Sequence, residues 1–285
     1  MSSRTFNRVF MRFPSFKRKA VTLSYDDGVP QDKRLIEIMS KNGLRGTFNI
    51  NSELFEEPNS GKERFRMSKQ EAVALYSATD NEIAVHGAKH LSLPDVKAVV
   101  ALNDIMSDRK NLEKIFERVI NGMAYPFGTY NDEVVELLKK CEIFYARTVK
   151  DSLGFEIPTD WLRLSPTCHH NNPKLMEMAK EFVEHQTDNV LLNCPMLFYL
   201  WGHSFEFDRN NNWDVIEEFA EFVGNREDIW YATNGEIYDY VFAYDLLRFN
   251  AEGNRCFNPS AVDVYLCYYG RDIKVPSGKT VSLKG

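Results

Sequence analysis

The chain has 285 residues, of which 44% are hydrophobic and 27% are charged, and its formal net charge at pH 7 is −6. These proportions are ordinary for a globular protein with a sizeable core, and they argue against an intrinsically disordered chain. The negative charge balance, with no helix-long basic stripe, argues against a nucleic-acid partner.

The first 19 residues carry six basic side chains but lack the apolar stretch that a secretory signal needs, so we expect a solvated N-terminal arm. Five cysteines without a close pair fit reduced thiols, which favours a cytoplasmic protein. An extracellular location stays open if the natural chain begins before Met1. The longest apolar run, about 190–201, is interrupted by polar residues and Pro195, so we expect no membrane segment.

From residue 20 onward, short apolar strands alternate with amphipathic helices. The predicted strands lie at 20–26, 47–50, 82–85, 123–126, 144–149, 197–202 and 229–232. The predicted helices include one that stops at Gly43, one opened by a Ser68–Glu71 capping box, one from Pro94 toward Ile120, one after Asn131, and others at 173–185, 213–224 and 235–247. Seven such units predict a parallel sheet covered by helices, either an open sheet or a barrel, and their number favours an α/β barrel over residues 20–249. The alternation after residue 250 predicts a small β appendage over 250–285.

Two carboxylates and two histidines fall at predicted strand ends. Asp26 and Asp27 end the first strand, and His86 with His90 follow the third. In a parallel α/β fold the carboxyl ends of the strands form the working surface. Two histidines and one carboxylate are a typical set for catalytic zinc, which leaves the second aspartate free to act as a base. A solvated Asp-Gly turn and two solvated loop histidines are the alternative interpretations.

The stretches "TLSYDDG" and "HGAKH" together resemble the first two motifs of the polysaccharide deacetylase family, the NodB-homology carbohydrate esterases. The resemblance implies a distorted (β/α)7 barrel that removes acetyl groups from N- or O-acetylated sugars. It implies that Asp26 is the general base and that Asp27, His86 and His90 hold a divalent metal, zinc or cobalt, with nickel or manganese as further candidates. Gly87 stands where the family has Ser or Thr, so a loop-fixing hydroxyl is missing.

The third family motif is Arg-x-Pro-Tyr-Gly, and the stretch "AYPFG" departs from it. Ala124 occupies the position of the arginine that orients the base, whereas the backbone N–H of Phe127 can still serve the oxyanion hole. Arg147, at the end of the next predicted strand, is our candidate for the missing cation. A surface ion pair is the alternative interpretation of Arg147.

The sequence matches the fourth and fifth family motifs less closely than the first two. Asp160 and Trp161 only hint at the fourth motif, because Ile157 stands where its first aspartate belongs. His203 follows an apolar strand, as the general acid of the fifth motif does. A buried neutral histidine is the alternative for His203.

Several residues are candidates for contacts with substrate, namely Pro126, Tyr130, Trp201, His169 and His170. Aromatic side chains here could stack on a sugar ring or belong to the core. Neighbouring residues on an extended segment point in opposite directions, so we expect at most one histidine of the pair 169–170 to face the cavity and no second metal site there.

The sequence therefore predicts a metal-dependent hydrolase that removes acetyl groups from an N-acetylated oligo- or polysaccharide. Two alternatives stay open. One is a small-molecule C–N hydrolase of the cyclic ureide or imide type on the same fold. The other is a metal-retaining carbohydrate-binding protein with little or no catalysis. The sequence leaves the oligomeric state open.

Overall fold

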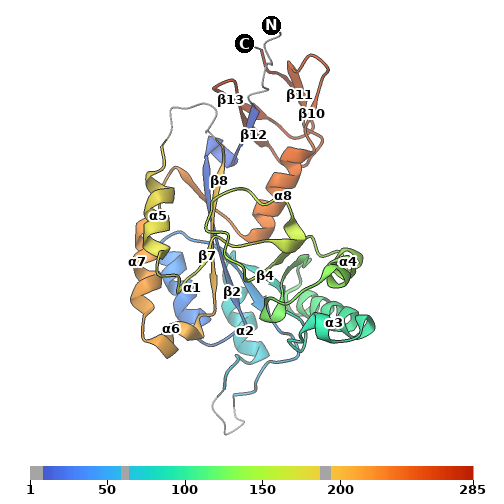
Figure 1. Cartoon of the computed structure of the whole chain (residues 1–285), viewed down its shortest axis with the longest axis vertical. Helices are drawn as coiled ribbons and strands as arrows, with labels where there is room; N and C mark the ends of the chain where they lie inside the picture. Colours follow the sequence, from blue (N-terminus) through green and yellow to red (C-terminus); the bar gives the residue numbers. More distant parts are fainter. Residues whose placement is uncertain (1–8, 59–63, 187–193, 285) are drawn as a thin grey trace.

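The structure is a computed structural model that describes residues 9–58, 64–186 and 194–284 (Figure 1). Its centre is one curled sheet of parallel strands, in the order β6-β5-β4-β3-β2-β8-β7, with β9 paired to the start of β2. The strands are β2 (Lys19–Asp26), β3 (Gly46–Ile50), β4 (Glu82–Val85), β5 (Gly122–Ala124), β6 (Tyr145–Arg147), β7 (Cys168–His169), β8 (Met196–Gly202) and β9 (Ile229–Tyr231). The seven predicted strands are all present, and in the described part of the central sheet the two-residue β7 is additional.

Helices cover the outer face of this sheet (Figure 1). They are α1 (Asp32–Lys41), α2 (Lys69–Tyr76), α3 (Ala98–Phe116), α4 (Asp132–Lys140), α5 (Leu175–Glu184), α6 (Phe205–Asn210), α7 (Trp213–Val223) and α8 (Asn234–Asp245). The predicted capping box of Ser68 and Glu71 opens α2. Pro94 lies in a separate 3-10 turn, η2 (Leu93–Asp95), and the extended residue Val96 keeps that turn apart from α3. The predicted start of that helix was therefore too early.

The sheet is curled, and its two edges therefore approach each other. The stretch after η4 (Trp161–Arg163) forms a parallel bridge between Leu164 and Arg147 at the end of β6. Three residues later, the N–H of Thr167 donates to the carbonyl of Tyr199 in β8. The curled sheet with its surrounding helices confirms the predicted α/β barrel, in its distorted (β/α)7 form.

The C-terminal segment forms two small antiparallel sheets. One contains β1 (Val9–Arg12), β12 (Val264–Tyr268) and β13 (Arg271–Val275), and the other contains β10 (Arg248–Phe249), β11 (Arg255–Phe257) and β14 (Thr280–Ser282). They lie at the upper end of Figure 1, where β2 and β8 begin. This confirms the small β appendage.

The prediction of a solvated N-terminal arm is wrong for residues 9–19, and residues 1–8 lie outside the described part of the chain. Residues 9–12 form the edge strand β1 against β12, and Phe13 is fully buried. The hydroxyl of Tyr240 in α8 donates to the carbonyl of Arg12. Apolar side chains within the basic stretch explain the difference, because burying them against the appendage offsets the cost of ordering the segment.

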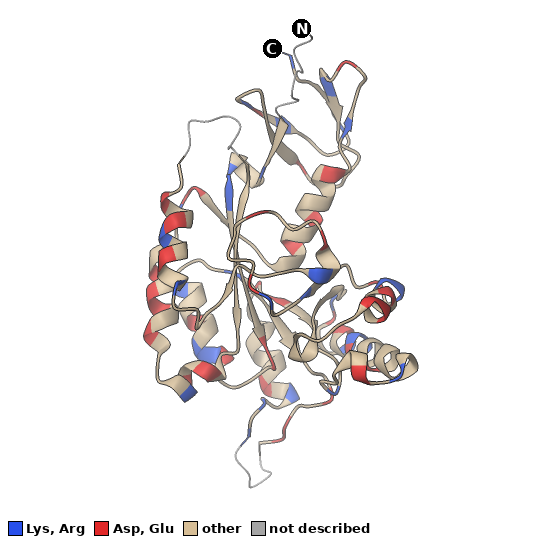
Figure 2. Cartoon of the chain, viewed as in Figure 1, with Lys and Arg blue, Asp and Glu red and all other residues tan. Residues whose placement is uncertain are grey.

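Helices α1, α3 and α4 carry both acidic and basic residues, whereas the charged residues of α7 and α8 are all acidic (Figure 2). Within the described ranges, no helix combines the length and apolar character needed to cross a membrane.

Candidate active site

The carboxyl ends of four strands bring the predicted chemical groups together. Asp26 is the last residue of β2 and Arg147 the last of β6, while His86 follows β4 directly. His203 follows the last residue of β8, Gly202. Because the strands are parallel and adjacent in one curled sheet, side chains far apart in the sequence converge at one rim.

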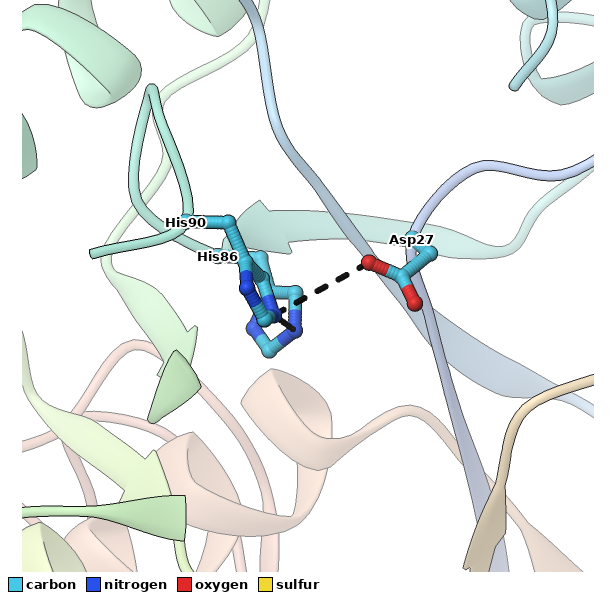
Figure 3. Close-up of side chains that lie close together, drawn as sticks. All are labelled: Asp27, His86 and His90. Atoms are coloured by element: carbon cyan, nitrogen blue, oxygen red, sulfur yellow. Dashed lines mark hydrogen bonds and ion pairs between the residues drawn. The ribbon is translucent and has the colours of Figure 1, made fainter. Parts of the chain in front are cut away.

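Asp27, His86 and His90 form a compact donor set, shown in Figure 3. One ligand atom from each lies within 4.8 Å of the others. The two Nε2 atoms are 3.2 Å apart, and Nε2 of His90 is 3.9 Å from Oδ1 of Asp27. Two nitrogens bound to one tetrahedral zinc ion at about 2.0–2.1 Å would be separated by roughly 3.3 Å, which is close to the spacing observed here.

Hydrogen bonding fixes the tautomer of His86 in a form suited to a metal. Nδ1 of His86 lies 2.9 Å from the carbonyl oxygen of Ala124, and a carbonyl can only accept, so Nδ1 carries the proton. Nε2 is then left with its lone pair toward His90. Burial and the nearby His86 lower the pKa of His90 to about 4, which keeps that imidazole neutral. Two imidazoles and a carboxylate are donors that fit a divalent cation.

Arg66 pairs with the carboxylate of this donor set. Its guanidinium donates to Oδ1 of Asp27 at 2.8 Å and lies 3.3 Å from Oδ1 of Asn51. Asp27 itself has a left-handed backbone, with φ 80°, which turns its side chain out of line with β2. This backbone turn explains how adjacent aspartates take different positions.

Asp26 is buried and has a partner on each carboxylate oxygen. Oδ1 accepts a hydrogen bond from Nδ2 of Asn49 at 2.8 Å, and Oδ2 accepts one from the guanidinium of Arg147. Oδ2 also lies 3.8 Å from Nε2 of His86 and 3.8 Å from Nε2 of His203. Burial alone would raise the pKa of Asp26, but Arg147 and the two histidines outweigh burial and lower it to about 2.

Arg147 is fully buried, so its interpretation as a surface ion pair is wrong. Its guanidinium carbon lies 4.4 Å from the ring centroid of Trp201, and the indole N–H of Trp201 donates to Asp151 at 3.2 Å. Trp201, one of the predicted substrate contacts, therefore supports Arg147 with one ring face and is itself almost buried.

Two aspartates of α3, which the motif search did not single out, hold the loop that carries His86 and His90. Asp108 accepts hydrogen bonds from the backbone N–H of Ser52 and of His86, and Asp104 accepts one from Lys89. These hydrogen bonds hold the backbone on both sides of Gly87. Their spacing of four residues on one helix face was the available signal, because acidic residues on a buried face need partners.

The turn η3 (Pro126–Gly128) forms the next part of the rim. Phe127 has φ 57° and an exposed ring, whose centroid lies 4.4 Å from that of His90. Pro126 is buried. The ring of Tyr130 stacks on Tyr125 with centroids 4.9 Å apart, and the Tyr130 side chain remains partly exposed.

His203 contacts Glu206, which lies at the centre of a second cluster with His169 and His170. Nδ1 of His203 lies 3.6 Å from Oε1 of Glu206, and Nε2 of both His169 and His170 lies 3.1 Å from Oε2. Both rings contact one carboxylate, but only the ring of His169 is partly exposed, so the expectation that at most one histidine of the 169–170 pair faces the cavity is not contradicted. β7 ends at His169, so the alternation of an extended strand no longer applies to the residue that follows.

The histidines of this pair differ in burial. His170 is buried and its ring stacks on Phe207 with centroids 4.1 Å apart, whereas His169 is partly exposed. Asp160, the hint of a fourth motif, caps η4 and pairs with Arg163 in an exposed position. Glu206 was missed by the sequence reasoning, although its position three residues after His203 on a helix was a usable signal.

The comparisons with known proteins agree with this fold. Residues 14–146 match the family described as polysaccharide deacetylase, which confirms the resemblance seen in the sequence. The match includes Asp26, Asp27, His86, His90 and Phe127. A comparison with curated proteins gives no match.

Solved structures of other proteins are similar to this chain, and three of them show the range of the similarity. A candidate polysaccharide deacetylase from Mycobacterium smegmatis aligns over 82% of this chain and 93% of its own, at 16% identity and a TM-score of 0.56. A family 4 carbohydrate esterase from Streptomyces lividans, in complex with acetate, aligns over 75% and 92% at 13% identity and a TM-score of 0.49. The Streptococcus pyogenes deacetylase PplD, also with acetate, aligns over 49% of this chain and 59% of its own, at 18% identity and a TM-score of 0.44.

Proposed function

We propose that this chain, whose residues 14–146 match the polysaccharide deacetylase family, hydrolyses the acetamide of an N-acetylated oligo- or polysaccharide with a bound divalent metal. Asp27, His86 and His90 would hold the ion, with zinc as the first candidate. The ion supplies Lewis-acid polarisation of the acyl carbonyl and a lowered pKa for the attacking water.

One observation carries the proposal. The carboxylate of Asp26 lies between the donor pair and the candidate acid, with Oδ2 at 3.8 Å from Nε2 of both His86 and His203. A base in this position can accept a proton on one side of a scissile amide while an imidazolium donates one on the other side. The solvated-turn interpretation of the two aspartates explains neither the burial of Asp26 nor its partners.

The residues of the chain have separate tasks in the reaction. Asp26 accepts the proton of the water that attacks the acetyl carbon, and the backbone N–H of Phe127 donates to the oxyanion that develops. His203 then donates a proton to the departing nitrogen as the C–N bond breaks, because an unprotonated amine is a poor leaving group. Arg147 and Asn49 keep Asp26 ionised and fixed in direction.

The test measures acetate release from chitooligosaccharide together with the metal content of the same preparations. We expect one divalent ion per chain, acetate release by the wild type, and loss of turnover in Asp26→Asn and His203→Ala with the metal retained. His185→Ala is the matched control, because His185 follows the last residue of α5 and lines a cavity with Arg18 and Met196, at the starts of β2 and β8, whereas these groups lie at the carboxyl ends of the strands. Loss of the metal in His203→Ala would contradict the roles assigned here.

The same preparations separate the two alternative functions. Ring opening of a cyclic ureide or imide without acetate release would favour the small-molecule hydrolase. Stoichiometric metal and sugar binding without either reaction would favour a carbohydrate-binding protein.

A further inference from the structure

The carboxylate of Glu206 lies at the centre of a group of cationic and potentially cationic side chains. His169 and His170 approach Oε2, while His203 and Arg209 approach Oε1, the latter at 3.2 Å. Asn171 adds an amide contact at 3.4 Å to Oε2. The side chain of Glu206 is only 12% exposed, so this negative charge is stabilised by its neighbours more than by water.

His169, His203 and Glu206 also have ligand atoms close enough to hold a metal ion. The tautomer of His169 argues against that use. Nδ1 of His169 accepts the backbone N–H of Asn171 at 3.1 Å, so in the neutral ring the proton lies on Nε2, the atom that faces Glu206. In the donor set of Asp27 the opposite holds, because His86 turns an Nε2 lone pair toward His90. The neutral ring of His169 therefore presents an N–H to the Glu206 carboxylate, and not a lone pair to a metal ion.

We propose that Glu206 is a positioning residue for the acid His203. Its carboxylate faces Nδ1 of that imidazole across 3.6 Å, and this ion-pair contact directs the Nε2–H at the nitrogen of the leaving group. His169, His170 and Arg209 hold the Glu206 carboxylate in place. The proposal rests on the proposed deacetylase function, and the carboxylate that it assigns to His203 comes from α6.

The electrostatics of His203 support this assignment. Burial lowers the pKa of its imidazole, but Glu206, then Asp26 and Asp27, raise it by more, so the pKa lies above its ordinary value. The groups that face the ring come from three elements: Asp26 from β2, His169 from β7, and Glu206 from α6. A raised pKa keeps the imidazolium populated near neutral pH, as a general acid requires.

The first arm of the test is independent of activity. The chain has six histidines, so the imidazole of His203 can be assigned by comparison with His203→Ala and titrated by NMR in the full-length, metal-loaded protein. We expect Glu206→Gln to lower the measured pKa of His203 by about one unit, a tenfold change in its protonation equilibrium. Glu206→Asp, which keeps the charge, should retain part of the wild-type value. Glu218→Gln, an exposed carboxylate of α7, should leave it unchanged.

The second arm uses acetate release. In Glu206→Gln the alkaline limb of the kcat profile should move to lower pH by the same shift, with KM little changed. An unchanged His203 titration in a folded Glu206→Gln protein would overturn the proposal. A second metal equivalent that disappears in Glu206→Gln would overturn it in favour of a metal site. If Glu206→Gln does not fold, the pKa of His203 in Glu206→Asp decides whether Glu206 positions the acid. A wild type that releases no acetate rejects the proposed function, and the NMR titration then still tests the role of Glu206.

Discussion

Arg147 and Ala124 are Cα partners in the parallel pair formed by β6 and β5. Partners on adjacent strands project their side chains to the same face of the sheet, so a side chain at either position is directed to the same region. We propose that Arg147, whose guanidinium contacts Asp26, takes the role that the resemblance implies for an arginine at the position of Ala124.

Replacing Arg147 should therefore destabilise the protein and impair the base together. Arg147→Met leaves the buried carboxylate of Asp26 without its cation, and breaking a buried pair in this way costs about 3–5 kcal/mol. The free energy of unfolding from urea titration at pH 7 measures the loss. Arg163→Met, which breaks an exposed pair with Asp132, is the control and should change the stability little.

A second variant tests the geometric equivalence of the two strand positions. Arg147→Ala combined with Ala124→Arg should recover part of the stability and acetate release lost in Arg147→Ala alone. A double variant no better than the single one would show that the two positions are not interchangeable.

Metal binding should stabilise the fold through Asp27, His86 and His90. A ligand that binds only the folded state at 100 times its Kd adds about 2.7 kcal/mol to the free energy of unfolding. Stripping the protein with a chelator should lower Tm, and added zinc should restore it. In His90→Ala both responses should shrink, as measured by calorimetry, while His185→Ala should behave as the wild type. A Tm insensitive to chelator and zinc contradicts a bound metal.

Restoring the hydroxyl of the family motif at Gly87 should harm this protein. A Cβ at Gly87 would lie 2.6 Å from Oδ2 of Asp104, and the backbone there has φ +75°. The left-handed backbone costs about 1–2 kcal/mol for a residue with a Cβ, and the overlap adds about 1–3 kcal/mol. Gly87→Ser should therefore lower both the unfolding free energy and the affinity for zinc.

The chain offers a matched control for the backbone contribution. Gly253 has φ +65° and no atom within 4 Å of a built Cβ, so Gly253→Ser carries the conformational cost alone. Adding Asp104→Ala to Gly87→Ser should relieve the overlap. Equal losses in Gly87→Ser and Gly253→Ser would mean that Asp104 does not exclude the side chain.

Asp32 should make stability depend on pH. Burial raises the pKa of its carboxyl from 3.8 to about 7, against the hydrogen bonds from Ser204 and Tyr76 that lower it. Because the folded-state pKa is the higher one, the stabilising contribution is full below about pH 4. It is lost as the pH rises toward 7, by about 1.4 kcal/mol per unit or roughly 4 kcal/mol in total.

The measurement compares unfolding free energies of the wild type and Asp32→Asn from pH 4 to pH 8. The difference between the two curves isolates Asp32 from the histidines that titrate in the same range. We expect the wild type to lose stability relative to Asp32→Asn as the pH rises. Asp80→Asn, an exposed carboxylate, is the control, and parallel curves for the wild type and Asp32→Asn would refute the prediction.

The sequence by itself determined the elements and the first half of the site. Strand and helix periodicity, the capping box of Ser68 and the ends of the strands at Asp26 and His86 are local properties, because each depends on residues within a few positions of one another. Parallel topology then places strand ends on one rim, which is why the convergence of Asp26, His86 and His203 was predictable.

Only the tertiary structure decided which partners those residues have. The contact of Arg147 with Asp26, the support of the His86 loop by Asp104 and Asp108, and the pairing of β1 with β12 each join segments far apart in the sequence. They depend on strand order, register and the burial of charge, which no local pattern encodes. The contacts of Glu206 with His169 and His170 likewise join α6 to a segment far away in the sequence.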